Sequence, residues 1–317
     1  MRENELVDEL RELFRTDDPS VLTGSGPDDC AHVRSDGRRL SMTVDAFVEG
    51  SHFLPDAPAG DVARKALAAS LSDLASSGCR ARWVLVVLGM RPGLPEGWAD
   101  EFARELAAAA REYGVAVVGG DTVSSRKEVF VSVTAVGEPL PGGPALRSGA
   151  RPGDALVVTG MLGGSLLGRH LRPTPRFREM AALLGFVHDA SLPPLSAAMD
   201  ISDGLALDLS RMCRESGVGA VVEAAAVPAS PEAFQTAESS GRTVLDHALS
   251  DGEDFELLLA LPQETWEAFE RFLAGAAEDG LARFSRIGRF TAEQGLFLHK
   301  QDGATTPLAA AGYEHLW

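Results

Sequence analysis

Residues 199–205 constrain the fold more than any other stretch, because an apolar approach there ends in two aspartates three positions apart. A helical pattern follows directly, and Gly217 lies just past its end. The stretch therefore predicts a strand, a turn and the N-terminus of a helix, with Ser202 or Asp203 as a suitable N-cap. Helix capping alone would explain one such pair of residues. Whether the stretch also belongs to a binding site depends on the other aspartates in the chain.

Other aspartates lie at the expected ends of other elements. Asp45 and Asp121 each follow a β-like run, Asp73 lies near the end of a helical run, and Asp28 and Asp29 lie in a loop rich in glycine and proline. Carboxylates that share one site repel one another unless cations neutralise them. Oxygen ligands favour a hard ion, and Mg²⁺ is the natural one beside phosphates. We therefore expect a shared carboxylate site that binds Mg²⁺.

Composition excludes several classes of partner. The chain has 317 residues and a net charge of −17, which argues against binding to nucleic acid or to an anionic membrane surface. No apolar run approaches the length of a membrane span, and the N-terminus lacks the apolar core of a signal peptide. Cys30, Cys79 and Cys213 follow no metal-binding spacing, which favours a reduced, cytoplasmic compartment.

Apolar periodicity predicts alternating strands and helices, as in an α/β or α+β protein. In the first half we expect helices at 5–14, 61–77 and 95–113, and strands at 40–44, 83–90, 115–120 and 129–136. In the second half we expect strands at 155–158, 219–222 and 257–261, then a helix and two short strands. The length favours two domains, and glycine and proline are concentrated at 139–154. The expected domains are therefore 1–139 and 140–317.

The chemistry suggested by these residues is phosphoryl transfer. No P-loop, protein-kinase signature, zinc-binding helix or nucleophile elbow is found in the sequence. Aspartates, glycine-rich turns and Arg147 suit transfer by positioning and by metal-borne charge neutralisation. The glycine-rich loop 159–165 could offer backbone N–H groups to a phosphate, although such loops also serve close helix packing.

Short motifs along nearly the whole chain together resemble the thiamine-monophosphate kinase family, within the superfamily of aminoimidazole ribonucleotide synthetase. They lie at 28–31, 43–45, 48–53, 65–68, 71–75, 119–122, 147–150, 152–154, 159–160, 173–176, 199–205, 252–257 and 312–315. The resemblance implies a two-domain fold, with an N-terminal mixed sheet and helices and a C-terminal α/β domain. It also implies ATP-dependent phosphorylation of thiamine phosphate to thiamine diphosphate, and a homodimer formed through the N-terminal domains.

The resemblance further implies roles for individual residues. The implied Mg²⁺ ligands are Asp29, Thr43, Val44, Asp45, Asp73, Asp121, Asp200 and Asp203. The implied ATP contacts are Gly120, Arg147 and Ser202, and the implied thiamine phosphate contacts are His52, Glu253 and Tyr313. No general base is expected, because the attacking phosphate oxygen is already mostly ionised at neutral pH.

Two other interpretations stay open. One is a different ATP-using enzyme of the same superfamily. Some branches of that superfamily carry a reactive or C-terminal cysteine, whereas the last residue of this sequence is Trp317, which makes this interpretation weaker. The other is a nucleotide-binding protein without activity, against which the full set of aspartates argues. The chain also departs from the family in one segment, since Ser165 and Pro173 are only eight positions apart.

Overall fold

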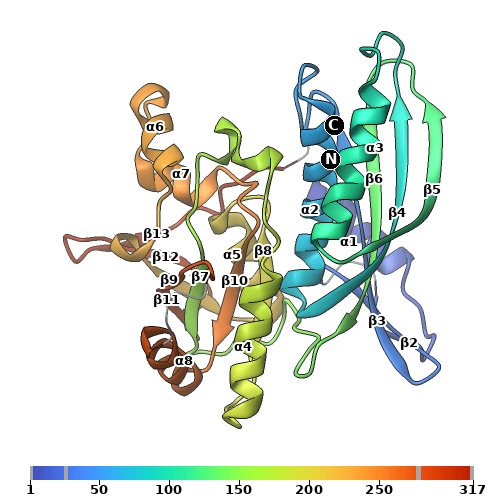
Figure 1. The fold of residues 1–317 in the computed structure, drawn as a ribbon. Coiled ribbons are helices and arrows are strands. Elements are labelled where there is room, and N and C mark those ends of the chain that lie inside the picture. The colour runs from blue at the N-terminus through green and yellow to red at the C-terminus, as the bar shows by residue number, and fades with distance from the viewer. Residues whose placement is uncertain (1–2, 25–27, 276–279, 315–317) are drawn as a thin grey trace.

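Two β-sheets, one from each half of the chain, carry the fold in the computed structural model, which describes residues 3–24, 28–275 and 280–314 (Figure 1). Within these residues the first sheet has the strand order β1-β2-β3-β6-β4-β5. The second has the order β13-β12-β9-β11-β7-β10-β8. Helices pack on both sheets, which confirms the expected mixed α/β class with two sheet-based halves (Figure 1).

The first half builds an antiparallel sheet with one parallel edge pair. Its strands are β1 (Val21–Thr23), β2 (Ala31–Ser35), β3 (Arg38–Val48), β4 (Cys79–Met90), β5 (Ala116–Ser124) and β6 (Phe130–Pro139). Its helices are α1 (Glu3–Leu13), α2 (Ala59–Ser76) and α3 (Trp98–Glu112). Only the β4–β5 pairing in this sheet is parallel, within the described residues. Strands β1 and β2 were not expected from the sequence.

Two expected strand ends in this half are wrong. β3 continues past Asp45 to Val48, because Ala46 and Phe47 extend the pairing with β6. β5 likewise continues past Asp121 to Ser124, paired with β4. Both aspartates therefore lie inside strands, and the side-chain alternation of the strand decides which face each one meets.

The second half has a largely antiparallel sheet covered by helices. Its strands are β7 (Ala155–Thr159), β8 (Ala197–Ile201), β9 (Gly219–Glu223), β10 (Glu256–Leu261), β11 (Phe284–Thr291), β12 (Gly295–His299) and β13 (Thr305–Pro307). Its helices are α4 (Phe177–Asp189), α5 (Leu205–Ser216), α6 (Pro231–Ser240), α7 (Val244–Ser250) and α8 (Gln263–Gly275), with 3₁₀ turns η1 (Ser165–Leu167), η2 (Arg169–Leu171) and η3 (Ala224–Ala226). Every residue of β7, β8 and β10 is buried, so both faces of the central sheet are covered.

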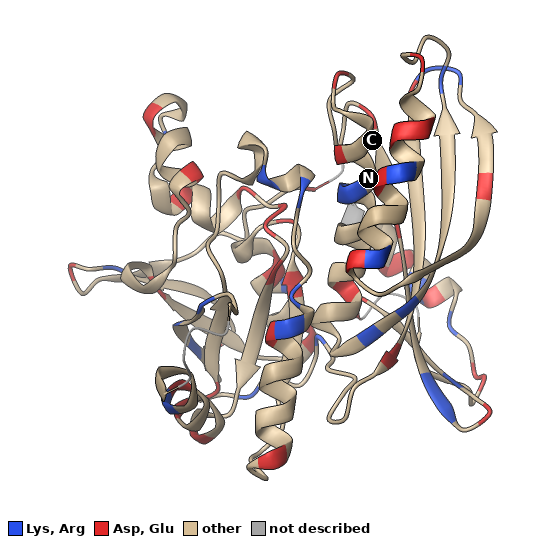
Figure 2. Cartoon of the chain, viewed as in Figure 1, with Lys and Arg blue, Asp and Glu red and all other residues tan. Residues whose placement is uncertain are grey.

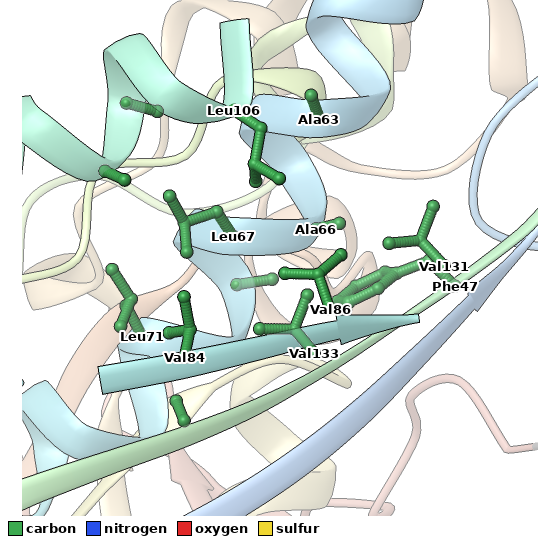
Figure 3. Packing of buried hydrophobic residues seen from close by; sticks show 14 of the residues in the cluster. Phe47, Ala63, Ala66, Leu67, Leu71, Val84, Val86, Leu106, Val131 and Val133 are labelled. Carbon is green, nitrogen blue, oxygen red and sulfur yellow. The ribbon is translucent and has the colours of Figure 1, made fainter. Parts of the chain in front are cut away.

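Helix α2 is the central element of the core. Fifteen of its eighteen residues are buried, because one side packs on β3, β4 and β6 and another meets α4 and β8 of the second half. Figure 3 shows Leu67 and Leu71 of α2 against Val84 and Val133 of the sheet. Burying each such leucine contributes about 2 kcal/mol. A helix that is apolar on most sides must be surrounded by other parts of the protein. Here the first sheet and the second half surround α2, so its C-terminal turn lies at the junction of the two halves.

The segment between β6 and β7 joins the two halves. It contains the expected domain boundary at residues 139 and 140, and that division stays a prediction. Acidic residues lie on both sides of the junction (Figure 2). None of the helices in the described ranges is both long and apolar enough to span a bilayer.

Candidate active site

A cavity of about 620 Å³ opens at the junction of the two halves. Its walls come from β3 and the loop after it, from α2, from η1 and η2, from the β8–α5 turn and from the loop before β10. Nine of the fourteen predicted site residues line it: Val44, Asp45, His52, Asp73, Asp200, Ser202, Asp203, Glu253 and Tyr313. Residues far apart in the sequence therefore meet at one concave site, which is the usual form of a small-molecule site.

A cluster of carboxylates lines part of the cavity, with Asp200 buried and Asp45 and Asp73 half-buried. Asp45 comes from β3, Asp73 from α2 and Asp200 from β8. Burial, together with the nearby charges of Asp29 and Asp203, raises the pKa of Asp45 to about 6. Burial, followed by repulsion from neighbouring aspartates, also raises the pKa of Asp73 and of Asp200 well above the usual value. Ionising this cluster is therefore unfavourable unless a cation joins it.

The donor set of this cluster fits Mg²⁺. All its ligand atoms are oxygens, and Oδ2 of Asp200 is buried without a hydrogen-bond partner, so it can accept an ion. Thr43 donates its hydroxyl hydrogen to Asp73, which brings another oxygen to the cluster. Among the described residues, no three His, Cys, Asp or Glu side chains converge closely enough to hold a metal by themselves. Mg²⁺ is usually held by one or two carboxylates together with water and substrate phosphates, which matches this arrangement.

Asp29 and Arg147 form an ion pair beside the carboxylate cluster. The hydroxyl of Ser76 donates to the same Asp29 carboxylate over 3.2 Å, and the backbone N–H of Arg147 donates to Asp28 over 3.2 Å. Burial raises the pKa of Asp28 to about 7. Nε of Arg147 is buried without a partner in the described structure. Arg147, a predicted ATP contact, is thus paired with Asp29, a predicted metal ligand. Neither residue lines the cavity itself.

The turn before α5 differs from the expected capping arrangement. Gly204 is the N-cap residue, and neither Ser202 nor Asp203 caps the helix with its side chain. Instead the buried carboxylate of Asp208 accepts hydrogen bonds from the backbone N–H groups of Asp203 (3.0 Å) and Gly204 (3.2 Å). Arg211 in turn donates to both Asp203 and Asp208. Since Asp208 satisfies the helix N-terminus, Ser202 and Asp203 line the cavity instead.

Gly120 and Asp121 lie away from the cavity, on the exposed edge strand β5. A Cβ at Gly120 would lie 1.8 Å from the carbonyl oxygen of Val86, so glycine is needed for the close approach of β5 to β4. Asp121 accepts a hydrogen bond from the N–H of Thr122. Their roles in ATP and metal binding stay predictions, since neither residue lines the cavity in this chain by itself.

Two histidines at the other end of the cavity present opposite hydrogen-bonding groups. Nδ1 of His52 accepts the N–H of Val48 at 3.0 Å, which places the proton of a neutral ring on Nε2. Nδ1 of His170 lies 3.0 Å from the carbonyl oxygen of Ser165, so Nδ1 carries its proton and Nε2 is an acceptor. Burial, with the nearby ammonium of Lys65, lowers the pKa of His170 and favours this neutral form. In their neutral forms the two rings are therefore different tautomers.

The glycine-rich loop 159–165 does not offer its N–H groups to a phosphate in this structure. Gly163 donates to both oxygens of Asp254 at 3.0 Å, and Gly164 donates to Asp251 at 3.0 Å. The N–H groups of Gly160 and Leu162 donate to backbone carbonyls. A Cβ at Gly163 or Gly164 would clash with the backbone of α7 or α6. The packing interpretation of this loop is therefore supported, and the phosphate-binding one is not.

Sequence reasoning missed Lys65 and His170 as neighbours of the site. Lys65 lies within the buried α2, where its charge interrupts the apolar pattern, and His170 lies in the short segment between Ser165 and Pro173. A lysine within an otherwise apolar helical pattern could have indicated that Lys65 has a buried acidic partner. His315 of the last motif, and residues 25–27 of the glycine- and proline-rich loop before Asp28, lie outside the described residues.

Comparisons with known proteins show which family this chain resembles in sequence and fold. Residues 27–138 match the family model "AIR synthase related protein, N-terminal domain", and residues 151–301 match "AIR synthase related protein, C-terminal domain". The chain is 38% identical to the thiamine-monophosphate kinase of Rhodopirellula baltica, over 88% of this chain and 86% of that protein. It is 35% identical to the Salmonella typhimurium thiamine-monophosphate kinase, over 93% of this chain and 92% of that protein.

A solved structure of AaThiL complexed with AMPPCP and TMP is similar over 99% of this chain and 97% of that chain, with a TM-score of 0.82 and 28% identity. Hydrogenase maturation protein HypE in complex with ATP is similar over 96% of this chain and 93% of that chain, with a TM-score of 0.70 and 23% identity. The HypE likeness shows a shared fold.

Proposed function

We propose that this chain, which belongs to the thiamine-monophosphate kinases of the AIR synthase related family, transfers the terminal phosphate of ATP to thiamine phosphate. The chain is accordingly an enzyme, a phosphotransferase. The observation that carries the substrate assignment is the cavity, which joins carboxylates at one end to His52 and Glu253 at the other. The relative solved with an ATP analogue and TMP shares this fold over nearly its whole length.

We further propose that Mg²⁺ ions bind at the carboxylate end. Asp45, Asp73 and Asp200 would hold them, with Asp29, Thr43, Val44 and Asp203 as further ligands. Asp121 lies on the exposed strand β5, so its proposed role as a ligand would have to be at that edge of the sheet. When bound, Mg²⁺ supplies positive charge that lowers the repulsion between two anionic phosphates. The unpartnered Asp200 oxygen and the raised pKa values of the cluster support this assignment.

The reaction requires positioning more than proton transfer. The second pKa of a phosphate is about 6, so the attacking oxygen of thiamine phosphate needs no general base at neutral pH. The residues of this chain therefore align the acceptor oxygen with the terminal phosphorus of ATP for in-line displacement and exclude water from that line. His52, Glu253 and Tyr313 line the acceptor end. Ser202 lines the cavity beside the carboxylates, and Arg147 pairs with Asp29.

An exposed apolar face on the first sheet supports a homodimer. Val44 and Leu85 share one row of this face, because both pair with Thr134 of β6. Val44 is 64% exposed, Leu85 45% and Val118 57%. A second copy covering this face would bury apolar area and bring the exposed strand β5, with Asp121, against a neighbouring chain. We also propose a cytoplasmic location, since the three cysteines form no disulfide.

A coupled assay tests the proposed activity. ADP release from ATP, Mg²⁺ and thiamine phosphate is measured together with thiamine diphosphate by chromatography, and both products are expected in equal amounts. Omitting thiamine phosphate is the control for plain ATP hydrolysis. Folded protein that forms no thiamine diphosphate would contradict the assignment.

A further inference from the structure

Lys65 is a fully buried charge in the middle of α2. Its relative exposure is 0%, and it is among the largest fully buried side chains in the described structure. An ammonium group removed from water is strongly destabilising unless it is paired and hydrogen-bonded. Burial accordingly lowers the pKa of Lys65, while the Glu253 carboxylate opposes this change. The hydrogen-bond partners of Lys65 must therefore offset the free-energy cost of burying its charge.

Those partners are two residues of the cavity wall. Nζ of Lys65 donates to the Glu253 carboxylate at 2.5 Å and also to the backbone carbonyl oxygen of His52. His52 lies in the loop after β3, in the first half, and Glu253 lies in the loop before β10, in the second half. One ammonium group thus links the two walls of the cavity across the junction.

The loop that carries Glu253 has a backbone suited to this contact. Glu253 has φ +55° and Phe255 has φ +52°, values that residues other than glycine rarely adopt and that cost of the order of 1 kcal/mol each. The N–H of Glu253 donates to the carbonyl of Ser202, and the N–H of Phe255 donates to the carbonyl of Ile201 at 2.8 Å. These bonds hold the strained loop against the β8–α5 turn, with Glu253 directed at Lys65.

The two members of the ion pair face different surroundings. The Glu253 side chain is 23% exposed and lines the cavity, whereas the Lys65 side chain is 1% exposed and lies behind it. A ligand in the cavity can therefore meet Glu253 and His52, and Lys65 can act on that ligand through them. A purely structural ion pair would not need one partner in the cavity wall.

We propose that Lys65 is a positioning residue, which holds Glu253 and the His52 loop at the spacing that the acceptor substrate requires. This inference rests on the proposed function, since the acceptor is thiamine phosphate. Lys65 lies eight residues before Asp73 on α2, which is about 12 Å along the helix axis. We therefore expect the effect of Lys65 to fall on the acceptor and not on ATP at the carboxylates.

Steady-state kinetics of Lys65→Met tests the proposal. Methionine keeps most of the volume and removes the charge and the donors. The KM for thiamine phosphate is expected to rise about 10- to 100-fold, because a charged hydrogen-bond network is lost, while the KM for ATP changes less than about threefold. Lys300→Met, an exposed lysine, is the matched control and is expected to behave as the wild type. An equal rise of both KM values, or an unchanged KM for thiamine phosphate, would overturn the proposal.

A double-mutant cycle with Glu253→Gln separates positioning from an independent effect. If Lys65 acts through Glu253, the KM for thiamine phosphate of the double variant is close to that of the worse single variant, and additive effects would count against the proposal. Should Lys65→Met fail to fold, Lys65→Gln, which keeps a donor without charge, takes its place in both measurements.

A failure of the Lys65 proposal can be distinguished from a failure of the proposed kinase activity. Wild-type protein that forms no thiamine diphosphate rejects the activity, whatever the variants do. The same cycle measured by thermal unfolding needs no substrate and reports the Lys65–Glu253 link directly. Coupling between the two substitutions is expected in that measurement, and its absence would overturn the link even in an active enzyme.

Discussion

Mg²⁺ is expected to stabilise the metal-free protein more at about pH 8 than at about pH 5. The cause is the carboxylate cluster of Asp45, Asp73 and Asp200, in which burial raises each pKa. At low pH protons neutralise the cluster, and at high pH a bound cation must do so. The effect of the ion therefore depends on how far the carboxylates are ionised.

Asp45 gives the size of the effect. Its pKa is about 6 in the folded protein against 3.8 for an unperturbed group. The folded state thus holds a proton that the unfolded state releases, so the contribution of Asp45 to stability is complete below about pH 4 and is lost as pH rises through about 6. Two pKa units correspond to about 3 kcal/mol. Asp45 is half-buried and faces a cavity that is open to solvent, so solvent screening reduces this figure.

Thermal unfolding with EDTA or with Mg²⁺ measures this effect across the pH range. An ion at 100 times its dissociation constant adds about 2.7 kcal/mol, or a Tm increase of roughly 5 °C for a chain of this size. Asp45→Asn cannot ionise, so it should reduce both the Mg²⁺ shift and the pH dependence, whereas the exposed Asp56→Asn should not. An Mg²⁺ shift of equal size at both pH values, or one that persists fully in Asp45→Asn, would refute the reasoning.

Three further substitutions have defined outcomes. Asp203→Asn is expected to lower thiamine diphosphate formation at least about 100-fold, with a Tm close to wild type, because it removes a charge from the cavity and leaves the Asp208 contacts to the helix N-terminus in place. Gly120→Ala is expected to destabilise the fold by roughly 2–4 kcal/mol in urea unfolding, because its Cβ would overlap the carbonyl of Val86. Ser230→Ala is expected to cost about 2 kcal/mol in the same measurement, because the buried hydroxyl caps α6 and donates to the carbonyl of Gly163.

Local patterns predicted the elements that carry the site. The apolar run before Asp200 and the helical pattern after Gly204 gave the correct strand and helix, and Asp73 lies near the end of α2 as expected. Such features depend on neighbouring residues, so a single sequence reveals them. Helices α4, α6 and α7 and strands β1, β2 and β13 were missed. Except for α4, which has thirteen residues, they are at most ten residues long, and short elements depend on tertiary contacts for their stability.

Partners that are distant in sequence could not be predicted. Asp208 lies between Leu207 and Leu209 in the helical pattern, and only the folded turn shows that it accepts hydrogen bonds from the N–H groups of Asp203 and Gly204. The N–H groups of Gly163 and Gly164 are bonded to acids about ninety residues later in the chain. Lys65 is charged within an apolar pattern, and its partner Glu253 is 188 positions away.

The enclosure of α2 limits how this protein can move. Because the helix packs on the first sheet and also on α4 and β8, the halves cannot swing apart without exposing its apolar surface to water. Opening by a rigid hinge is therefore much more costly than rearrangement of the loops around the cavity mouth. We therefore expect substrates and products to pass through the cavity mouth without separation of the two halves, and the two halves to unfold together.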